Sequence, residues 1–79
     1  MNNLEKYNQS FMDCFSIDES VLNDKLHYNT IPEWDSIGHM DLISTFEEAF
    51  GIMMEMDDII DLSSYKKGME LLAKYGVDF

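Results

Sequence analysis

The chain has 79 residues, and 16 acidic residues against 5 lysines give it a net charge of −11. This length allows a single domain spanning residues 1–79, and the acidity disfavours nucleic acid and anionic membranes as partners because both require a basic surface. Basic protein surfaces are the expected partners, and the plain alternative is that the acidity only keeps the protein soluble.

Cysteine content and hydropathy predict the compartment. Cys14 is the one cysteine, so no internal disulfide can form and a reducing environment is expected. No apolar run approaches the roughly 20 residues of a membrane span. The first residues, MNNLEKYNQ, also lack the basic stretch and apolar core of a signal peptide. We therefore expect a cytoplasmic protein, and we expect it to be a monomer.

The first predicted helix covers Asn3–Phe15, and Asn2 and Glu5 before and within it have the spacing of a capping box. Its apolar residues recur at helical spacing on one face. They are Leu4, Tyr7, Phe11, Cys14 and Phe15. We interpret Cys14 as a small buried hydrophobe rather than a reactive thiol.

Residues 17–35 form a long connection that is too apolar for a free linker. Its apolar residues are Val21, Leu22, Leu26, Tyr28, Ile31 and Trp34. We expect this connection to lie across the helices, with a short helical turn near residues 19–23. A long ordered loop is itself a mild indication of function.

The second predicted helix covers Ser36–Phe50, with Gly51 as its expected C-cap. Its buried stripe is expected to contain His39, Leu42, Ile43, Phe46, Ala49 and Phe50. The opposite face mixes apolar and acidic residues, namely Ile37, Met40, Asp41, Ser44, Glu47 and Glu48. No lysine lies between His27 and Tyr65 to neutralise these acids. Such a face suits a partner with shallow apolar sockets and a basic rim.

The third predicted helix is short. It is expected at about residues 57–61, where the acids favour a helix N-terminus. Residues 52–56 connect it to the second helix, and Ile52 and Met54 in this connection are expected to pack inward.

The last predicted helix covers residues 65–75, with Ser63 or Ser64 as its cap and Gly76 at its end. Its expected core-facing residues are Met69, Leu72 and Ala73. No stretch shows the sustained alternation of a strand. The predicted fold is all-α, a small four-helix bundle with a long first loop and a short third helix.

Metal binding is not expected. The soft ligands Cys14, His27 and His39 have no zinc-ligand spacing. The acids at residues 57, 58 and 61 lack the alternating ligands, central glycine and terminal glutamate of a calcium loop.

Ser36 and His39 are three residues apart, so a hydrolytic pair is conceivable. Such a serine needs a base, an orienting group and an oxyanion hole, and His39 falls on the predicted buried stripe. The chain also has little room for a substrate pocket of several hundred Å³. We therefore expect no enzymatic activity of its own, and a serine hydrolase is the weaker alternative.

A third possibility is that a group is attached to Ser36, in the first turn of the second helix. The unsatisfied N–H groups and partial positive charge at a helix start favour a phosphodiester there. Asp35 can cap the helix and leave the serine hydroxyl free. From residue types alone, however, the interpretation of Ser36 as a simple helix cap is favoured.

Longer motifs favour attachment. Asp35-Ser36-Ile37, followed by HMDLI at residues 39–43 and FEEAFGI at residues 46–52, resembles the signature of the acyl carrier protein family, which includes peptidyl carrier domains. The resemblance extends from Trp34 to Ser64 and the last helix, and its layout covers the chain.

The resemblance implies that a phosphopantetheinyl transferase attaches 4′-phosphopantetheine from coenzyme A to Ser36, next to Asp35. The thiol of this arm then carries an acyl or aminoacyl group as a thioester. Loading ligases and downstream synthases or transferases dock through basic patches, and the carrier is not itself a catalyst. The positions that match the family's docking surface are Ile37, Met40, Asp41, Glu47, Glu48 and Asp57.

Two residues differ from the carriers of primary fatty acid synthesis, which usually have glycine and leucine where this chain has Trp34 and Ile37. The chain is more similar to stand-alone carriers of specialised pathways, or to peptidyl and polyketide carriers. The alternative function is a small acidic helical module that binds a basic partner and carries no prosthetic group.

Overall fold

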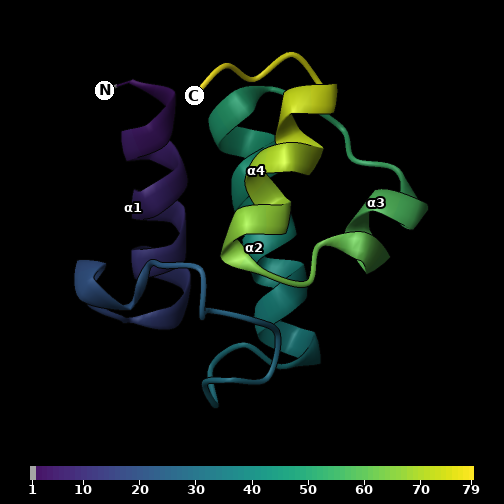
Figure 1. Cartoon of the computed structure of the whole chain (residues 1–79). Helices are drawn as coiled ribbons and strands as arrows, with labels where there is room; N and C mark the ends of the chain where they lie inside the picture. The colour runs from purple at the N-terminus through teal and green to yellow at the C-terminus, as the bar shows by residue number, and fades with distance from the viewer. Residues whose placement is uncertain (1) are drawn as a thin grey trace.

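The computed structural model describes residues 2–79. It contains four α-helices and one 3₁₀ turn, which are α1 (Asn3–Phe15), η1 (Glu19–Val21), α2 (Ser36–Phe50), α3 (Met56–Asp61) and α4 (Tyr65–Lys74). No strand occurs within the described residues. Figure 1 shows α1 beside α2 and α4, with the short α3 standing to one side. The prediction of a small all-α bundle with a long first loop and a short third helix is confirmed.

Side-chain caps explain why the three long helices begin where they do. Asn2, Asp35 and Ser64 each accept a hydrogen bond from the backbone N–H three residues later, at 2.8, 2.9 and 2.9 Å. Each cap satisfies a donor that the first helical turn leaves without an internal partner. Ser64, and not Ser63, is the cap of α4. Gly51 ends α2 with a φ of 64°, a left-handed conformation that glycine adopts without a steric penalty.

Aromatic rings form the centre of the core. Tyr7, Phe11 and Phe15 of α1 are buried and pack on α2 and on the long connection. The Phe11 ring lies 5.7 Å from the Phe46 ring and 5.5 Å from the Trp34 ring. Burial of each of these side chains contributes about 1.5–3 kcal/mol or more, so the contact of α1 with α2 accounts for much of the stability.

Tyr7 joins α1 to α4. Its hydroxyl donates a hydrogen bond to the Tyr65 carbonyl, and burial raises the pKa of the Tyr7 phenol well above its ordinary value, so the hydroxyl remains a donor. Gly68 lies directly against this hydroxyl, where a Cβ atom would collide with it. The glycine therefore lets the two helices approach closely.

The predicted core was wrong at several positions, and the close approach at Gly68 explains those on α4. Leu4 is 39% exposed and Ala73 is exposed, whereas Gly68 and Leu71 are buried. Contact at Gly68 turns α4 so that the stripe through residues 68, 71 and 72 faces the core. Ser10 of α1 is also buried, and its hydroxyl is satisfied because it donates to the Lys6 carbonyl at 2.8 Å. The predicted ends of the last two helices also needed correction, since α3 begins at residue 56 and α4 ends at residue 74.

The long connection lies across one end of the bundle, as predicted. Its only helical turn is η1, within the predicted residues 19–23. Tyr28 N–H donates to the Ser63 carbonyl at 2.8 Å, and Tyr65 N–H donates to the Leu26 carbonyl at 2.9 Å. Leu26 and Trp34 are buried. The two hydrogen bonds hold the connection against the start of α4.

Two further sequence predictions concern Cys14 and the connection between α2 and α3. Cys14 is half-buried, with its sulfur 3.1 Å from Thr45 Oγ1, and burial raises the pKa of its thiol. Ile52 is half-buried and Met54 is buried, so both pack inward as expected. Across residues 2–79, none of the helices has the length and apolar character needed to cross a bilayer.

Candidate functional site

Ser36 is the first residue of α2, and its side chain is exposed. The Asp35 carboxylate, and not the serine, accepts the capping hydrogen bond from Gly38 N–H. Interpreting Ser36 as a simple helix cap is therefore wrong. Within residues 2–79, the recorded partner of Ser36 Oγ is the phenol of Tyr28, at an Oη–Oγ distance of 3.1 Å.

The long connection fits tightly against the first turn of α2. A Cβ atom at Gly38 would collide with the Glu33 carbonyl and press on the Phe15 ring. The backbone N–H of Trp34 donates to the Ile31 carbonyl at 3.1 Å, which closes a turn just before the helix. Glycine at position 38 thus lets the loop pass close enough to fix the orientation of Asp35 and Ser36.

His39 is held by two hydrogen bonds. The indole N–H of Trp34 donates to His39 Nδ1 at 2.9 Å, and His39 Nε2 lies 2.8 Å from the Ile59 carbonyl. An indole nitrogen can only donate, so Nδ1 is the acceptor and Nε2 carries the proton given to the carbonyl. Neither nitrogen is free to take a proton from Ser36. The side chain instead ties the loop, α2 and α3 together, and this arrangement does not support a serine hydrolase.

A cavity of about 370 Å³ opens beside Ser36, between the start of α2 and α3. Its walls are mostly apolar and include Tyr28, Met40, Met56, Ile59 and Ile60. The prediction that the chain has little room for a pocket of several hundred Å³ is wrong. The reason is that α3 stands away from α2 instead of packing flat against it. The apolar residues at positions 56, 59 and 60 fall on one side of a short helix. This spacing is the feature of the sequence that indicates an apolar wall here.

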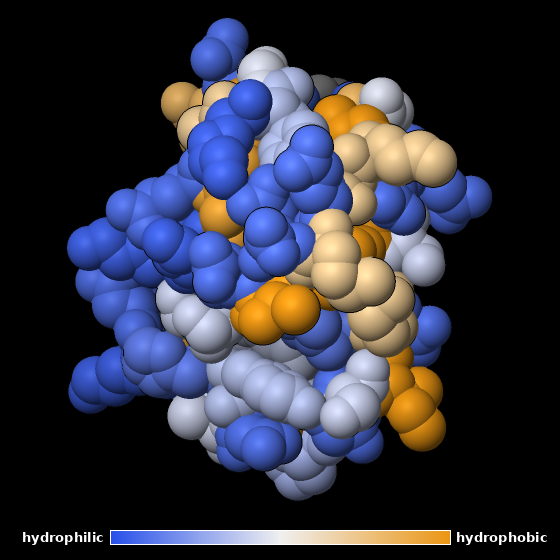
Figure 2. Space-filling view, turned by 90° about the vertical axis from the view of Figure 1, so that its right-hand side faces the viewer, coloured by the Kyte–Doolittle hydropathy of each residue, from blue (hydrophilic) through white to orange (hydrophobic). Residues whose placement is uncertain are grey.

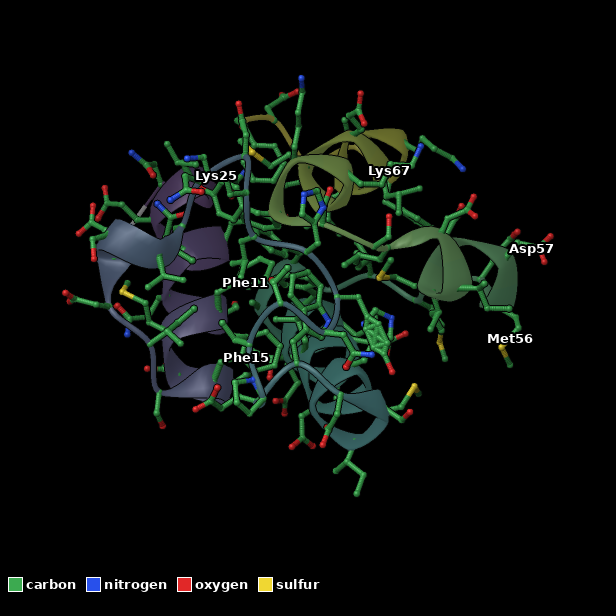
Figure 3. The ribbon with its side chains drawn as sticks, turned by 60° about the horizontal axis from the view of Figure 1, so that its bottom comes forward. Phe11, Phe15, Lys25, Met56, Asp57 and Lys67 are labelled. Atoms are coloured by element: carbon green, nitrogen blue, oxygen red, sulfur yellow. The ribbon has the colours of Figure 1, made fainter. Side chains whose placement is uncertain are left out.

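Of the predicted docking residues, Met40 lines this cavity, and most of the others are exposed on α2 and α3. Ile37 is 77% exposed and Met40 is 52% exposed, while Asp41, Glu48 and Asp57 are exposed acids. Figure 2, in which α3 faces the viewer, shows apolar residues gathered among hydrophilic ones on this side. Figure 3 shows the side chains of Met56 and Asp57 pointing outward from α3, in contrast to Phe11 and Phe15.

Glu47 differs from the other predicted docking residues. It is half-buried, and its carboxylate accepts a hydrogen bond from Met54 N–H at 2.9 Å. Its main structural role is therefore to hold the connection between α2 and α3. Three exposed apolar side chains that were not predicted from the sequence follow in the chain, namely Met53, Met56 and Ile60.

Asp58 anchors α3 to the end of α4. Its carboxylate accepts hydrogen bonds from Lys74 Nζ at 2.7 Å and from Tyr75 Oη at 2.5 Å. The Lys74 ammonium, and then the Tyr75 hydroxyl, hold the pKa of Asp58 below its usual range. Tyr75 Oη also accepts from Glu55 N–H at 2.9 Å. This anchor was not predicted from the sequence, because Lys74 lies outside the lysine-free segment between His27 and Tyr65.

The remaining acids of the lysine-free segment form no recorded ion pair within residues 2–79. Lys74–Asp58 is the one ion pair within 4.0 Å that the structure records among residues 2–79. Asp41, Glu48 and Asp57 therefore give the exposed surface of α2 and α3 a negative potential. No group of three or more metal-binding side chains comes together in the part of the chain that the structure describes.

Comparisons of the chain with models of known protein families, with curated proteins and with solved structures found no match. The sequence motifs around Ser36 and the geometry of this site are therefore the features that bear on function.

Proposed function

We propose that the chain is a carrier protein of the acyl carrier type. A phosphopantetheinyl transferase attaches 4′-phosphopantetheine from coenzyme A to Ser36, and the arm carries an acyl or aminoacyl group as a thioester. The observation that carries this proposal is that Ser36 Oγ is exposed in the first turn of α2 while Asp35 serves as the cap. The serine hydroxyl can thus be modified without removing the interaction that starts the helix.

The surroundings of Ser36 suit the phosphodiester that would form there. The first turn of α2 directs backbone N–H groups toward its N-terminal end, and an anion at a helix N-terminus is stabilised by about 0.3–1 kcal/mol. The apolar cavity next to Ser36 offers an apolar cargo a place to lie. When bound, the arm supplies the thiol that carries the cargo, and the residues of the chain only hold and present it.

Partner recognition is proposed to use the face around the cavity. Ile37 and Met40 would enter shallow apolar sockets, and Asp41, Glu48 and Asp57 would meet a basic rim. This face suits the transferase, the loading ligase and the downstream synthases alike, since each has to approach Ser36. Trp34 and Ile37 favour a specialised pathway over primary fatty acid synthesis.

The proposal is tested by incubating the purified chain with coenzyme A and a promiscuous phosphopantetheinyl transferase. Intact-mass spectrometry should show the addition of a single arm to the wild type and none to Ser36→Ala. Ser44→Ala is the matched control, because it removes another exposed serine hydroxyl from the same helix. Absence of addition to the wild type with several transferases, or addition to Ser36→Ala, contradicts the proposal.

The exposed apolar side chains Met53, Met56 and Ile60 favour a second candidate. A small acidic module could bind a basic partner through the same face without any prosthetic group. The mass measurement separates the two candidates, since only a carrier gains the mass of the arm.

A further inference from the structure

Tyr28 brings a phenol hydroxyl to the candidate attachment point. Its Oη lies 3.1 Å from Ser36 Oγ, although the two residues belong to different elements. The ring is half-buried and packs near the Trp34 ring, at a centroid distance of 6.5 Å, and near the His39 ring, at 5.7 Å. The ring thus has packing partners of its own, and the hydroxyl is the part that reaches the serine.

The backbone around Tyr28 is held by several hydrogen bonds. Tyr28 N–H donates to the Ser63 carbonyl at 2.8 Å, and Asn29 N–H donates to the Trp34 carbonyl at 3.0 Å. Asn29 adopts a left-handed conformation with a φ of 70°, which asparagine tolerates better than most residues. The loop therefore closes on itself just before α2 and holds the phenol in a defined place.

We propose that Tyr28 is a positioning residue for the modification of Ser36. Its hydroxyl donates to Ser36 Oγ before the transfer, and to a non-bridging oxygen of the phosphodiester after it. This inference rests on the proposed carrier function and adds a role for a residue outside the motif that suggested it.

The chemistry of the transfer explains what this hydrogen bond does. The Ser36 Oγ–phosphorus bond forms as a phosphoanhydride bond of coenzyme A breaks. The serine proton passes to a base on the transferase, and adenosine 3′,5′-bisphosphate leaves. A hydroxyl that donates to Oγ selects one of the three staggered positions of an exposed serine. It also leaves the serine proton free to be removed.

After the transfer, the same hydroxyl faces a better acceptor. The phosphodiester carries a negative charge, and hydrogen bonds to charged oxygens are shorter and stronger than neutral ones. The Tyr28 hydroxyl would then donate to this anion in addition to the N–H groups in the first turn of α2. This arrangement would orient the base of the arm relative to the cavity.

Tyr28→Phe is the direct test, because it keeps the ring and removes only the hydroxyl. We expect kcat/KM for arm attachment to fall about three- to ten-fold, which is the size of one lost hydrogen bond. The loss should appear in kcat with KM unchanged, because Tyr28 is not one of the residues proposed to dock the partner. In the modified protein, the ³¹P chemical shift of the phosphodiester should differ from that of the wild type.

Tyr65→Phe is the control, since it removes a phenol hydroxyl that bonds to Asn8 and not to Ser36. It should leave both the attachment rate and the ³¹P shift unchanged. A Tyr28→Phe protein with wild-type kcat and ³¹P shift would overturn the positioning role while leaving the carrier function intact. A wild-type chain that accepts no arm from any transferase would overturn both.

Discussion

The two sides of this molecule are stabilised in different ways. On one side, α1 packs against α2 through buried aromatic rings, among them Phe11 and Phe46. On the other side, α3 has six residues, of which Asp58 alone is buried. It is held by a hydrogen bond that Asp58 accepts from Lys74 of α4 and by one from His39 to the Ile59 carbonyl. The comparison indicates that burial fixes the body of the bundle, whereas polar contacts set the position of the helix beside the candidate site.

The largest expected effect comes from the aromatic side. Phe11→Ala should lower the free energy of unfolding by about 3–5 kcal/mol, because it leaves a cavity among rings that cannot collapse to fill it. Chemical denaturation followed by circular dichroism measures this loss. Leu4→Ala on the same helix is the control and should change stability far less, since Leu4 is partly exposed. Equal losses of stability in the two variants would contradict the conclusion that buried rings stabilise this side of the molecule.

A smaller, local effect is expected at α3. Asp58→Asn should speed amide hydrogen exchange in Met56–Asp61 while leaving α1 protected, because it weakens the anchor to Lys74 and Tyr75. Exchange followed by mass spectrometry measures both regions at once. Asp57→Asn, an exposed neighbour, is the control. Equal acceleration in α1 and α3 would mean that the two sides do not behave separately.

The same anchor has a defined pH dependence. The folded state lowers the pKa of Asp58, so the stabilisation is fully present above the unfolded pKa of about 3.9. It is lost as pH falls through the lower folded value. Exchange in α3 of the wild type, corrected for the intrinsic rate, should therefore increase in this acidic range. The difference from Asp58→Asn should disappear there.

The smallest effect is expected from surface charge. Asp41→Lys with Glu48→Lys should slow arm attachment a few-fold at low salt and reduce its dependence on salt, since charges are screened over about 8 Å at physiological ionic strength. Initial rates at several salt concentrations measure this change. Glu5→Lys on α1 makes a single charge reversal on the aromatic side and should leave the rates unaltered. Rates of the double variant that match the wild type at every salt concentration would exclude steering by this face.

The elements with strong local signals were predictable from sequence. The ends of α1 and α2 matched the predicted residues, because Asn2, Asp35 and Gly51 mark them through hydrogen bonds or backbone conformations that depend on nearby residues alone. The rotation of α4 was not predictable, since it follows from contact between Gly68 and the Tyr7 hydroxyl. Helical periodicity identifies an apolar stripe but not the neighbour against which it turns.

The candidate site was predicted only in part. Asp35 and Ser36 were found from the start of a helix and from the motif. The cavity depends on where α3 stands relative to α2, and the Tyr28–Ser36 contact depends on the path of the long connection. Local patterns encode neither. The pairing of Asp58 with Lys74 was missed for the same reason, because it joins two helices through space.

The hydrogen bond from Trp34 to His39 also has a practical consequence. Trp34 is the one tryptophan of the chain, and it is buried beside the imidazole with an interplanar angle of 16°. Its indole therefore reports optically on the neighbourhood of Ser36. Changes in its emission would follow events at the start of α2 in real time, without any label attached to the protein.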